Sequence, residues 1–405
     1  MGIKVSLGVT IGLMALTAAA VFVVTDEMAF RRFNEKVRSV SEKQEFYTKL
    51  SETDSVVRNN YVGEIDEKNL IDRIISGYMN GLDDIYASYY TADEYAALDR
   101  SRTGILIGLG FDWEKDPTGY IRITNIHSGS PAEEYGLSAG DTVMAVNNIN
   151  VISYPGGYPE AVKNFTADEG VKVKLSIKRI NAEGATEFFN TDIISARTIV
   201  NSVDSVLRGN IGCIRISEFN GMTAGQVSSA VEKLQNSGAD RFIFDVRNNS
   251  CGTIEALKDV LEVILPAGDI VTAYYRGRTE TLIAAENDED RLDCPIAVIV
   301  NSGTKGEAEL FASALRDECG AAVVGRNTYG KGVLQEIYKL SDGSAVEFSS
   351  AVVCTRNSGD FTERGIKPDY DVMLSAGTDP FRLTAAEQEL YDTQLLKAEE
   401  VVSAG

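Results

Sequence analysis

The stretch from Cys294 to Gln335 constrains the fold of this chain more than any other. The apolar run Pro295–Val300 has the length of a buried strand, Glu307–Cys319 has apolar residues at helical spacing, and Ala321–Val324 is a second short apolar run. This order predicts a βαβ unit whose strand-to-helix turn is Asn301–Gly306. Reactive groups of such units sit beyond the carboxyl ends of the strands, near helix N-termini that favour anions, so chemistry is expected at this turn.

This stretch and the residues after it contain four distinctive motifs. They are Val300-Asn301-Ser302-Gly303-Thr304, Ala308-Glu309-Leu310-Phe311-Ala312, Gly325 with Thr328-Tyr329-Gly330-Lys331-Gly332 and Gln335, and Arg364-Gly365-Ile366-Lys367-Pro368-Asp369. Together they resemble the carboxyl-terminal processing peptidases, also called tail-specific proteases, a family of serine peptidases. The resemblance implies a multidomain α/β protein with a peptidase core of the ClpP/crotonase type, an inserted PDZ domain and no cofactor.

The resemblance also implies catalytic roles. The family uses a serine nucleophile on the strand-to-helix turn, a lysine base 25 residues later and a glutamine that positions the lysine; Lys331 and Gln335 match the last two. Counting back from Lys331 leads to Gly306, and the family pattern G-T/S-A-S-A aligns without a gap with Gly303–Glu307. The predicted nucleophile position is therefore vacant.

Composition excludes several other classes of function. With 405 residues, 44% hydrophobic and 24% charged, the chain is long enough for two to three domains with a sizeable core. A formal net charge of −21 argues against a nucleic-acid partner, since phosphate binding needs clustered cations. The five cysteines show no C-x-x-C spacing, which argues against a metal site or a disulfide framework. The single histidine, His127, lies in another predicted domain, so only a lysine-based arrangement is left for serine hydrolysis at the turn.

The N-terminal residues 1–29 predict a membrane anchor. Val5–Val24 holds only apolar, glycine and hydroxyl residues and has about the 20 residues that a helix needs to cross a bilayer. A cleaved signal peptide with Ala18-Ala19-Ala20 as its cleavage site is the alternative, but Val21–Val24 continues the apolar run beyond it. The resemblance implies a single-pass protein of the cell membrane with its body outside the cytoplasm.

Residues 30–103 show helical periodicity. Asp66 is the predicted N-cap of a helix over Glu67–Tyr78, and Gly81 is its predicted end. The run Gly81–Thr91 resembles the family's GLDDPYSSYYT element, which leads into its PDZ domain.

Residues 104–180 resemble that PDZ domain. The peptide Gly108-Leu109-Gly110-Phe111 matches the loop whose backbone N–H groups capture a terminal carboxylate. The framework motifs Ser130-Pro131-Ala132-Glu133, Gly136-Leu137 and Gly140-Asp141-Thr142-Val143 follow in the family's order, and Asp141 is expected to tie the turn after Gly140.

The core is predicted over 181–376, and within it a joining segment at Arg197–Leu207 precedes the first strand. Its first elements are a strand at Ile211–Ile216, a helix at Thr223–Asn236 and a strand at Arg241–Val246. Asp245–Gly252 then resembles the family's DLRNNPGG, whose first glycine lends an N–H to the oxyanion hole. Here that position is Cys251, with Gly252 and Glu307 completing the predicted oxyanion region.

Two side chains are alternative nucleophiles. Cys251 would be activated by a neighbouring lysine but attacks from the oxyanion side, and Thr304 lies about 6.5 Å from the vacant position along an extended chain. Glu307 would raise the pKa of a neighbouring Lys331 and Lys305 would lower it, and the sequence does not decide between them.

After Gln335, strands are predicted at Tyr338–Leu340 and Ala345–Val353, and residues 377–405 are expected to contain one helix over Thr384–Val402. The leading hypothesis is a membrane-anchored relative of the processing peptidases that binds polypeptide C-termini, or unfolded extracytoplasmic proteins, with impaired or absent peptidase activity. The alternatives are an active serine-type endopeptidase with a displaced nucleophile, and a non-catalytic regulator of an active paralogue. A homodimer is compatible with each of them.

Overall fold

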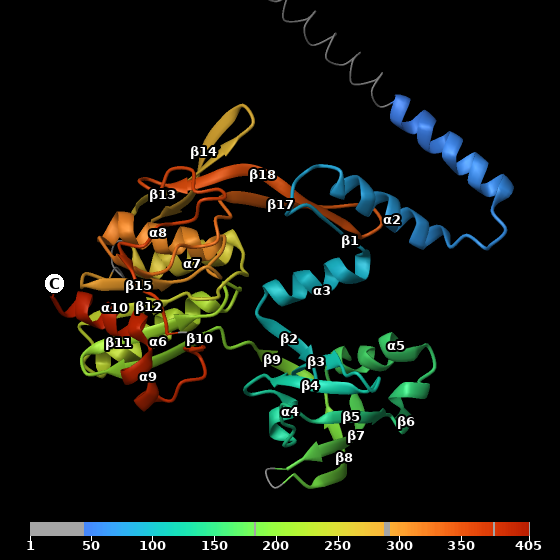
Figure 1. Ribbon diagram of the computed structural model, residues 1–405, viewed down its shortest axis with the longest axis horizontal. Helices are drawn as coiled ribbons and strands as arrows, with labels where there is room; N and C mark the ends of the chain where they lie inside the picture. The colour runs from blue at the N-terminus through green and yellow to red at the C-terminus, as the bar shows by residue number, and fades with distance from the viewer. Residues whose placement is uncertain (1–43, 182–183, 287–291, 376, 405) are drawn as a thin grey trace, which may run out of the picture. The chain divides into compact units, whose positions relative to one another are not determined.

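The computed structural model describes residues 44–181, 184–286, 292–375 and 377–404 (Figure 1). The chain divides into two compact units, Met1–Ile71 and Asp72–Gly405. In the described part of the first unit, residues 44–60 form a helix, and Arg58 donates hydrogen bonds to Asp54 and Glu67. Within the described ranges no helix is both long and apolar enough to cross a membrane, and the predicted anchor Val5–Val24 lies outside those ranges.

Helix α2 (Glu67–Asn80) begins where the sequence predicts. The backbone N–H of Asn69 donates to the Asp66 carboxylate at 3.1 Å, which is the N-cap bond that satisfies one free donor of the first turn. Gly81 follows the last helical residue. Helix α3 (Ala92–Arg102) starts at a capping box, in which the side chain of Thr91 and the carboxylate of Glu94 bond each other's backbone N–H.

The larger unit contains a six-stranded sheet in the order β10-β11-β12-β15-β16-β19. The strands β11 to β19 run parallel, and β10 pairs antiparallel with β11. A parallel sheet needs crossover helices, and the βαβ unit predicted around the turn supplies one of them. The bounds are β10 Val203–Arg208, β11 Ile211–Ile216, β12 Arg241–Asp245, β15 Ile296–Val300, β16 Ala322–Gly325 and β19 Tyr370–Asp371.

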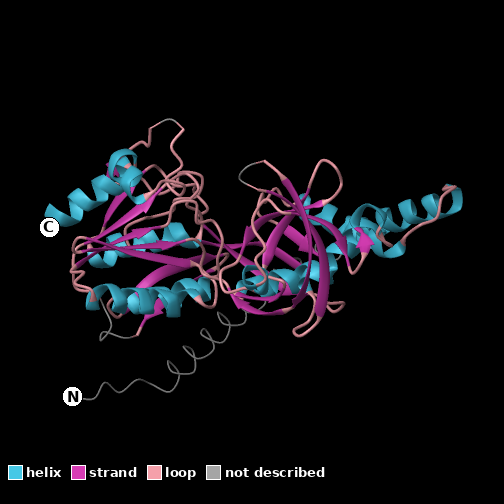
Figure 2. Ribbon diagram, turned by 90° about the horizontal axis from the view of Figure 1, so that it is seen from below, coloured by secondary structure: helices cyan, strands magenta, loops and turns pink. Residues whose placement is uncertain are grey.

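Helices cover both faces of this sheet (Figure 2). On one face α6, α7 and α8 pack against side chains such as Phe244 and Val298. On the other face α10 packs against Ile243 and Ile299. Every residue of β15 is buried, as expected for a strand with both faces covered. The bounds are α6 Thr223–Asn236, α7 Ile254–Ile264, α8 Glu307–Cys319 and α10 Thr393–Ala404.

A second sheet packs on the helical layer. Its strands follow the order β1-β18-β13-β14, with β17 paired to β18, and its apolar side chains join the same hydrophobic cluster as α7 and α8. The sequence analysis predicts β18 but only the end of β17, because its strand Tyr338–Leu340 overlaps β17 at Tyr338 and Lys339 alone, and it does not predict the hairpin of β13 and β14. The bounds are β1 Ser88–Tyr90, β13 Gly268–Tyr275, β14 Arg278–Ala285, β17 Val333–Lys339 and β18 Ala345–Thr355.

The predicted PDZ region has its own sheet and core. The sheet has the order β3-β4-β5-β7-β8, with β6 paired to β5, and encloses a separate hydrophobic cluster. The strands that enter and leave the region, β2 and β9, pair antiparallel, so the chain leaves beside the point where it entered, as an inserted domain requires. The bounds are β2 Ile105–Gly108, β3 Phe111–Lys115, β4 Ile121–Ile126, α4 Pro131–Glu134, β5 Thr142–Val146, β6 Ile149–Asn150, η1 Val151–Ser153, α5 Gly157–Lys163, η2 Asn164–Thr166, β7 Lys172–Ile180, β8 Thr186–Ile194 and β9 Ala196–Ile199.

Two predictions of secondary structure are wrong. The segment Arg197–Leu207 is not a plain connection, because it contains the end of β9 and most of β10. The single C-terminal helix is two helices, α9 (Ala385–Tyr391) and α10. They are separated at Asp392, which is fully buried and forms an ion pair with Arg247 at 2.9 Å. That tertiary ion pair and the bond from the Leu395 N–H to the Asp392 carboxylate start a new helix at this point.

Candidate active site

Two loops meet at the carboxyl edge of the parallel sheet. Because β12 and β15 are neighbours, the loop after β12 and the predicted turn after β15 lie side by side. The Asn301 carboxamide accepts from the Asn248 N–H at 3.0 Å and donates to the Asn248 side chain at 2.9 Å. The Lys305 N–H donates to the Asn249 carbonyl at 2.9 Å. These bonds hold the predicted nucleophile turn against the predicted oxyanion loop.

Gly306 lies next to Lys331 and has a backbone conformation that glycine adopts freely and other residues do not. Its backbone angles are φ +63° and ψ −115°, a conformation that residues with side chains rarely adopt and that is characteristic of strained turns carrying a nucleophile. A Cβ atom added here would lie 3.4 Å from Lys331 Cδ and 4.0 Å from Lys331 Nζ. A side chain at position 306 would therefore lie within reach of Lys331, and Gly306 supplies none.

Thr304, an alternative nucleophile, is fully buried and its hydroxyl is occupied. The hydroxyl donates to the Val246 carbonyl at 2.9 Å and accepts from the Asn301 N–H at 3.0 Å. Because the hydroxyl both donates and accepts a hydrogen bond within the protein, it links the end of β15 to the loop after β12. It is therefore not available for attack on a substrate.

Glu309 connects the turn to the loop that carries Lys331. It is fully buried, and its carboxylate accepts from the N–H of Gly306 at 2.9 Å, of Gly330 at 2.7 Å and of Lys331 at 2.8 Å, and from the Thr328 hydroxyl at 2.5 Å. Several charge-assisted bonds are what a buried carboxylate needs. The sequence analysis gives Glu309 no role beyond its motif, although its place three residues after the helix-start residue is the capping-box spacing.

The Tyr86 ring lies near the ammonium groups of both Lys331 and Lys305. Lys331 Nζ lies 5.4 Å from the centre of the Tyr86 ring, and Lys305 Nζ lies 4.9 Å from that ring and 4.3 Å from the Tyr329 ring, within the range of cation–π contacts. Burial and the neighbouring Tyr329 raise the pKa of Tyr86 to about 12, so its phenol is neutral at physiological pH. The sequence places Tyr86 in the Gly81–Thr91 element that resembles the family, but gives no signal that this element reaches Lys331.

Gln335 is bonded to the backbone of Tyr86 and not to the side chain of Lys331 in the described residues. Its carboxamide Nε2 donates to the Tyr86 carbonyl at 2.7 Å, and no hydrogen bond between the side chains of Gln335 and Lys331 is present in the described residues. The same segment is fixed by Asp84, whose carboxylate accepts from the Ser349 N–H at 2.7 Å. In this structure Gln335 therefore fixes the segment whose aromatic ring contacts the lysine.

The predicted oxyanion loop is intact at the level of its backbone. Cys251 does not have a positive φ, so the presence of its side chain does not strain the turn in the way a left-handed position would. Cys251 and Gly252 are held to Phe219, whose N–H donates to the Cys251 carbonyl at 3.0 Å. The described residues offer no protein acceptor to the N–H of Cys251 or to that of Glu307, which opens helix α8. Two free N–H donors are what an oxyanion hole requires.

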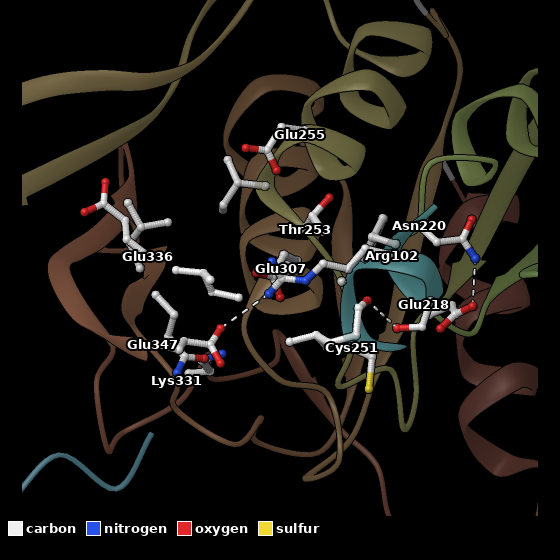
Figure 3. Close-up of a pocket in the computed structure, with 18 of the residues that line it drawn as sticks. Arg102, Glu218, Asn220, Cys251, Thr253, Glu255, Glu307, Lys331, Glu336 and Glu347 are labelled. Carbon is white, nitrogen blue, oxygen red and sulfur yellow. Dashed lines mark hydrogen bonds and ion pairs between the residues drawn. The ribbon is translucent and has the colours of Figure 1, made fainter. Parts of the chain in front are cut away.

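These groups share one cavity of about 680 Å³, which is large enough for a peptide segment. Figure 3 shows the labelled residues around it, including Cys251, Glu307 and Lys331. Its walls come from α3, from Glu218–Asn220, from Ser250–Glu255 and from β17. The structure thus brings together Lys331, Gln335, Cys251, Gly252 and Glu307, with Gly306 beside Lys331.

The predicted carboxylate-binding loop lies separately, between β2 and β3. A Cβ at Gly108 would lie 2.1 Å from the Phe165 carbonyl oxygen and one at Gly110 would lie 2.2 Å from Ser130 Cβ, so close packing alone requires both glycines. The Leu109 N–H is already used, because it donates to the Phe165 carbonyl at 2.9 Å. Phe111 begins β3, the edge strand of its sheet.

Two other residues of this region have clear structural roles. His127 bonds Asp112 at 3.1 Å, and that hydrogen bond lowers the pKa of Asp112. Asp141 is buried and fixes the turn at Gly140. Its carboxylate accepts from the Ser138 N–H at 2.9 Å and from Nε and Nη2 of Arg179, each at 2.7 Å.

Comparison with known proteins agrees with this architecture. The family model described as peptidase family S41 matches residues 210–372, the PDZ domain model matches 98–178, and the model of the activating protease CtpB N-terminal domain matches 9–94. A candidate S41 protease of solved structure from Bacteroides fragilis has a similar fold, with a TM-score of 0.50 at 15% identity over 81% of this chain and 90% of that chain.

Sequence relatives are more specific. The carboxyl-terminal-processing protease of Synechocystis is 33% identical over 291 residues, which are 71% of this chain and 67% of that protein. The carboxy-terminal processing protease CtpA of Bacillus subtilis is 29% identical over 338 residues, or 83% of this chain and 71% of that protein. The Synechocystis relative, together with the matches to the S41 peptidase and PDZ models, shows that the chain belongs to the carboxyl-terminal processing proteases of serine peptidase family S41.

Proposed function

We propose that this chain binds polypeptides in the manner of its family but does not cut them efficiently. The observation that carries the proposal is Gly306, where the side chain that would face Lys331 is missing while the lysine, its loop and the turn are retained. Thr304 cannot substitute, because its hydroxyl is buried and occupied on both sides. What is retained is a cavity with a cation and two free N–H donors, which suits the binding of a peptide carbonyl.

The PDZ domain is proposed to receive the polypeptide C-terminus. Since the Leu109 N–H is occupied, a carboxylate at this loop would rely on the N–H groups of Gly110 and Phe111. A bound peptide would continue along β3, whose outer edge is unpaired in the described sheet. The apolar run Val5–Val24 supports a membrane anchor that holds this body outside the cytoplasm.

The endopeptidase alternative rests on Cys251, because its thiol is exposed in the same cavity as Lys331. Its position on the oxyanion loop argues against it, since the thiol would approach a bound carbonyl from the side of the N–H donors. The regulator alternative requires neither cleavage nor binding of a free polypeptide.

One experiment separates the three. The full chain in detergent is incubated with an unstructured protein that has an apolar C-terminus, and binding and cleavage are scored together by pull-down and mass spectrometry. Binding without cleavage supports the proposal. Cleavage that is lost in Cys251→Ala supports the endopeptidase, and the absence of both supports the regulator.

A further inference from the structure

The cavity beside Gly306 combines apolar walls with an excess of carboxylates. Its charged lining consists of five glutamates and two cations, Arg102 and Lys331. Arg102 is paired with Glu347 at 3.4 Å, so the remaining charged lining consists of four glutamates and one cation, Lys331. None of those four forms an ion pair within the described residues. The four are Glu218, Glu255, Glu307 and Glu336.

The shape of the lining independently indicates an extended polypeptide. Five consecutive residues, Leu334–Tyr338, line the cavity, and they belong to β17. Among the described strands β17 pairs only with β18, so its other edge has backbone donors and acceptors without strand partners. An unpaired strand edge along a cavity is a template for a peptide in extended conformation.

The remaining walls suit long side chains with an apolar stem. Between the carboxylates lie aliphatic and aromatic groups, and Figure 3 shows the carboxylates of Glu255 and Glu336 separated by such apolar side chains. Lysine and arginine bury their methylene stems on apolar surface while the charged end stays near water or a carboxylate. The aliphatic and aromatic lining residues are Tyr95, Leu98, Phe219, Ile254, Tyr275, Leu282, Leu334, Ile337 and Tyr338.

We propose that this cavity selects extended polypeptide segments that carry lysine or arginine. The inference rests on the proposed function, because it names the class of polypeptide that the same cavity holds. The carboxylates lower the free energy of a bound cationic segment and raise that of an acidic one, so charge sets the choice of partner. The net charge of −21 attracts any cation weakly, and the test must separate that general effect from the local one.

The test compares three unstructured peptides with an identical apolar C-terminus, whose central positions carry lysine, glutamine or glutamate. The shared C-terminus keeps any contribution of the PDZ domain constant. Affinities are measured by fluorescence anisotropy with the full chain in detergent at low and high salt. We expect tighter binding of the lysine peptide than of the glutamine peptide, by about 1.5- to 5-fold for each lysine, and a smaller difference at high salt.

Two double variants locate the effect. Glu255→Gln with Glu336→Gln removes two cavity carboxylates, and Glu232→Gln with Glu389→Gln removes two exposed carboxylates that do not line the cavity. We expect the lysine preference to fall in the first double variant and to persist in the second. Equal affinities for lysine and glutamine peptides, or a preference that both double variants keep, would overturn the inference while leaving the proposed function standing. Failure of all three peptides to bind would overturn both.

Discussion

Restoring a hydroxyl at position 306 should convert the binding site into a peptidase. In Gly306→Ser the new Cβ lies 4.0 Å from Lys331 Nζ, so the hydroxyl one bond further out reaches hydrogen-bond distance of the amine, about 2.7–3.2 Å. The surrounding bonds from Glu309 to Gly306, Gly330 and Lys331 already hold both partners. No further backbone movement is needed for the base to take the hydroxyl proton.

The size of the gain follows from what the site retains. Removing the nucleophile of a serine peptidase lowers kcat by about 10⁶, and losing one oxyanion donor lowers it by about 10²–10³. Even if the Cys251 side chain removed one donor completely, the Ser variant should exceed the unmodified chain by about 10³. The φ of Cys251 is not positive, and among the described residues its N–H has no acceptor, so the Cys251 side chain leaves this oxyanion donor in place. Adding Cys251→Gly to Gly306→Ser should therefore raise kcat by less than the factor of about 10²–10³ that a missing donor costs.

The same change has a cost in stability. A side chain at φ +63° and ψ −115° is strained by about 1–3 kcal/mol, so the free energy of unfolding should fall by that amount. Gly306→Ala is the matched control, because it adds the same Cβ and strain without a hydroxyl. Both variants should lose similar stability in chemical denaturation, and only the Ser variant should gain activity.

The assay follows cleavage of an unstructured reporter protein by mass spectrometry. Lys331→Ala in the Gly306→Ser background should abolish the gain, since the hydroxyl then has no base. A well-folded Ser variant that cuts no faster than Gly306→Ala would refute the reasoning, because it would show that the site has lost more than its nucleophile.

Further predictions test the other parts of the account. Thr304→Val should lower the free energy of unfolding by about 1–3 kcal/mol in chemical denaturation, because it removes a buried hydroxyl with two partners; an unchanged stability would contradict its structural role. Amidating the C-terminus of a bound peptide should weaken binding by about 1–3 kcal/mol in calorimetry if residues 108–111 receive the carboxylate, and equal affinities would argue against that role. Iodoacetamide at pH 8 should modify the exposed Cys251 first and leave Cys213 unmodified in peptide mapping, since burial and the nearby Glu399 raise the pKa of Cys213 to about 12 and keep its thiol protonated. The chain should partition with membranes and keep residues 5–24, and N-terminal sequencing that begins near residue 21 would show a cleaved signal instead.

Local patterns in the sequence were enough to predict the elements that carry the site. Helix α8 and strand β11 have the predicted bounds, because a helical period and a short isoleucine-rich run are read from neighbouring residues alone. The turn that ends at Gly306 and its pairing with Lys331, 25 positions later, are predicted from the spacing of the family motif. The positive φ at Gly306 that makes this turn recognisable is visible only in the structure.

The parts that were not predicted depend on contacts between distant residues. Tyr86 reaches Lys331 only because Gln335 and Asp84 fix its segment to the second sheet. The C-terminal helix is divided at Asp392 by a buried ion pair with Arg247, which no local pattern indicates. In each case the deciding partner lies more than a hundred positions away in the sequence.

The central claim is that the chain holds polypeptide at a peptidase site without cutting it, and a single-turnover measurement tests it most directly. The full chain in detergent is placed in excess over a reporter protein that it binds, so that every reporter molecule is held, and the reporter is followed over time by mass spectrometry. The account predicts that the bound reporter stays intact with the unmodified chain and is cut by Gly306→Ser. Cleavage by the unmodified chain that disappears in Lys331→Ala would contradict the account, because it would show that the site has a working nucleophile although Gly306 has no side chain.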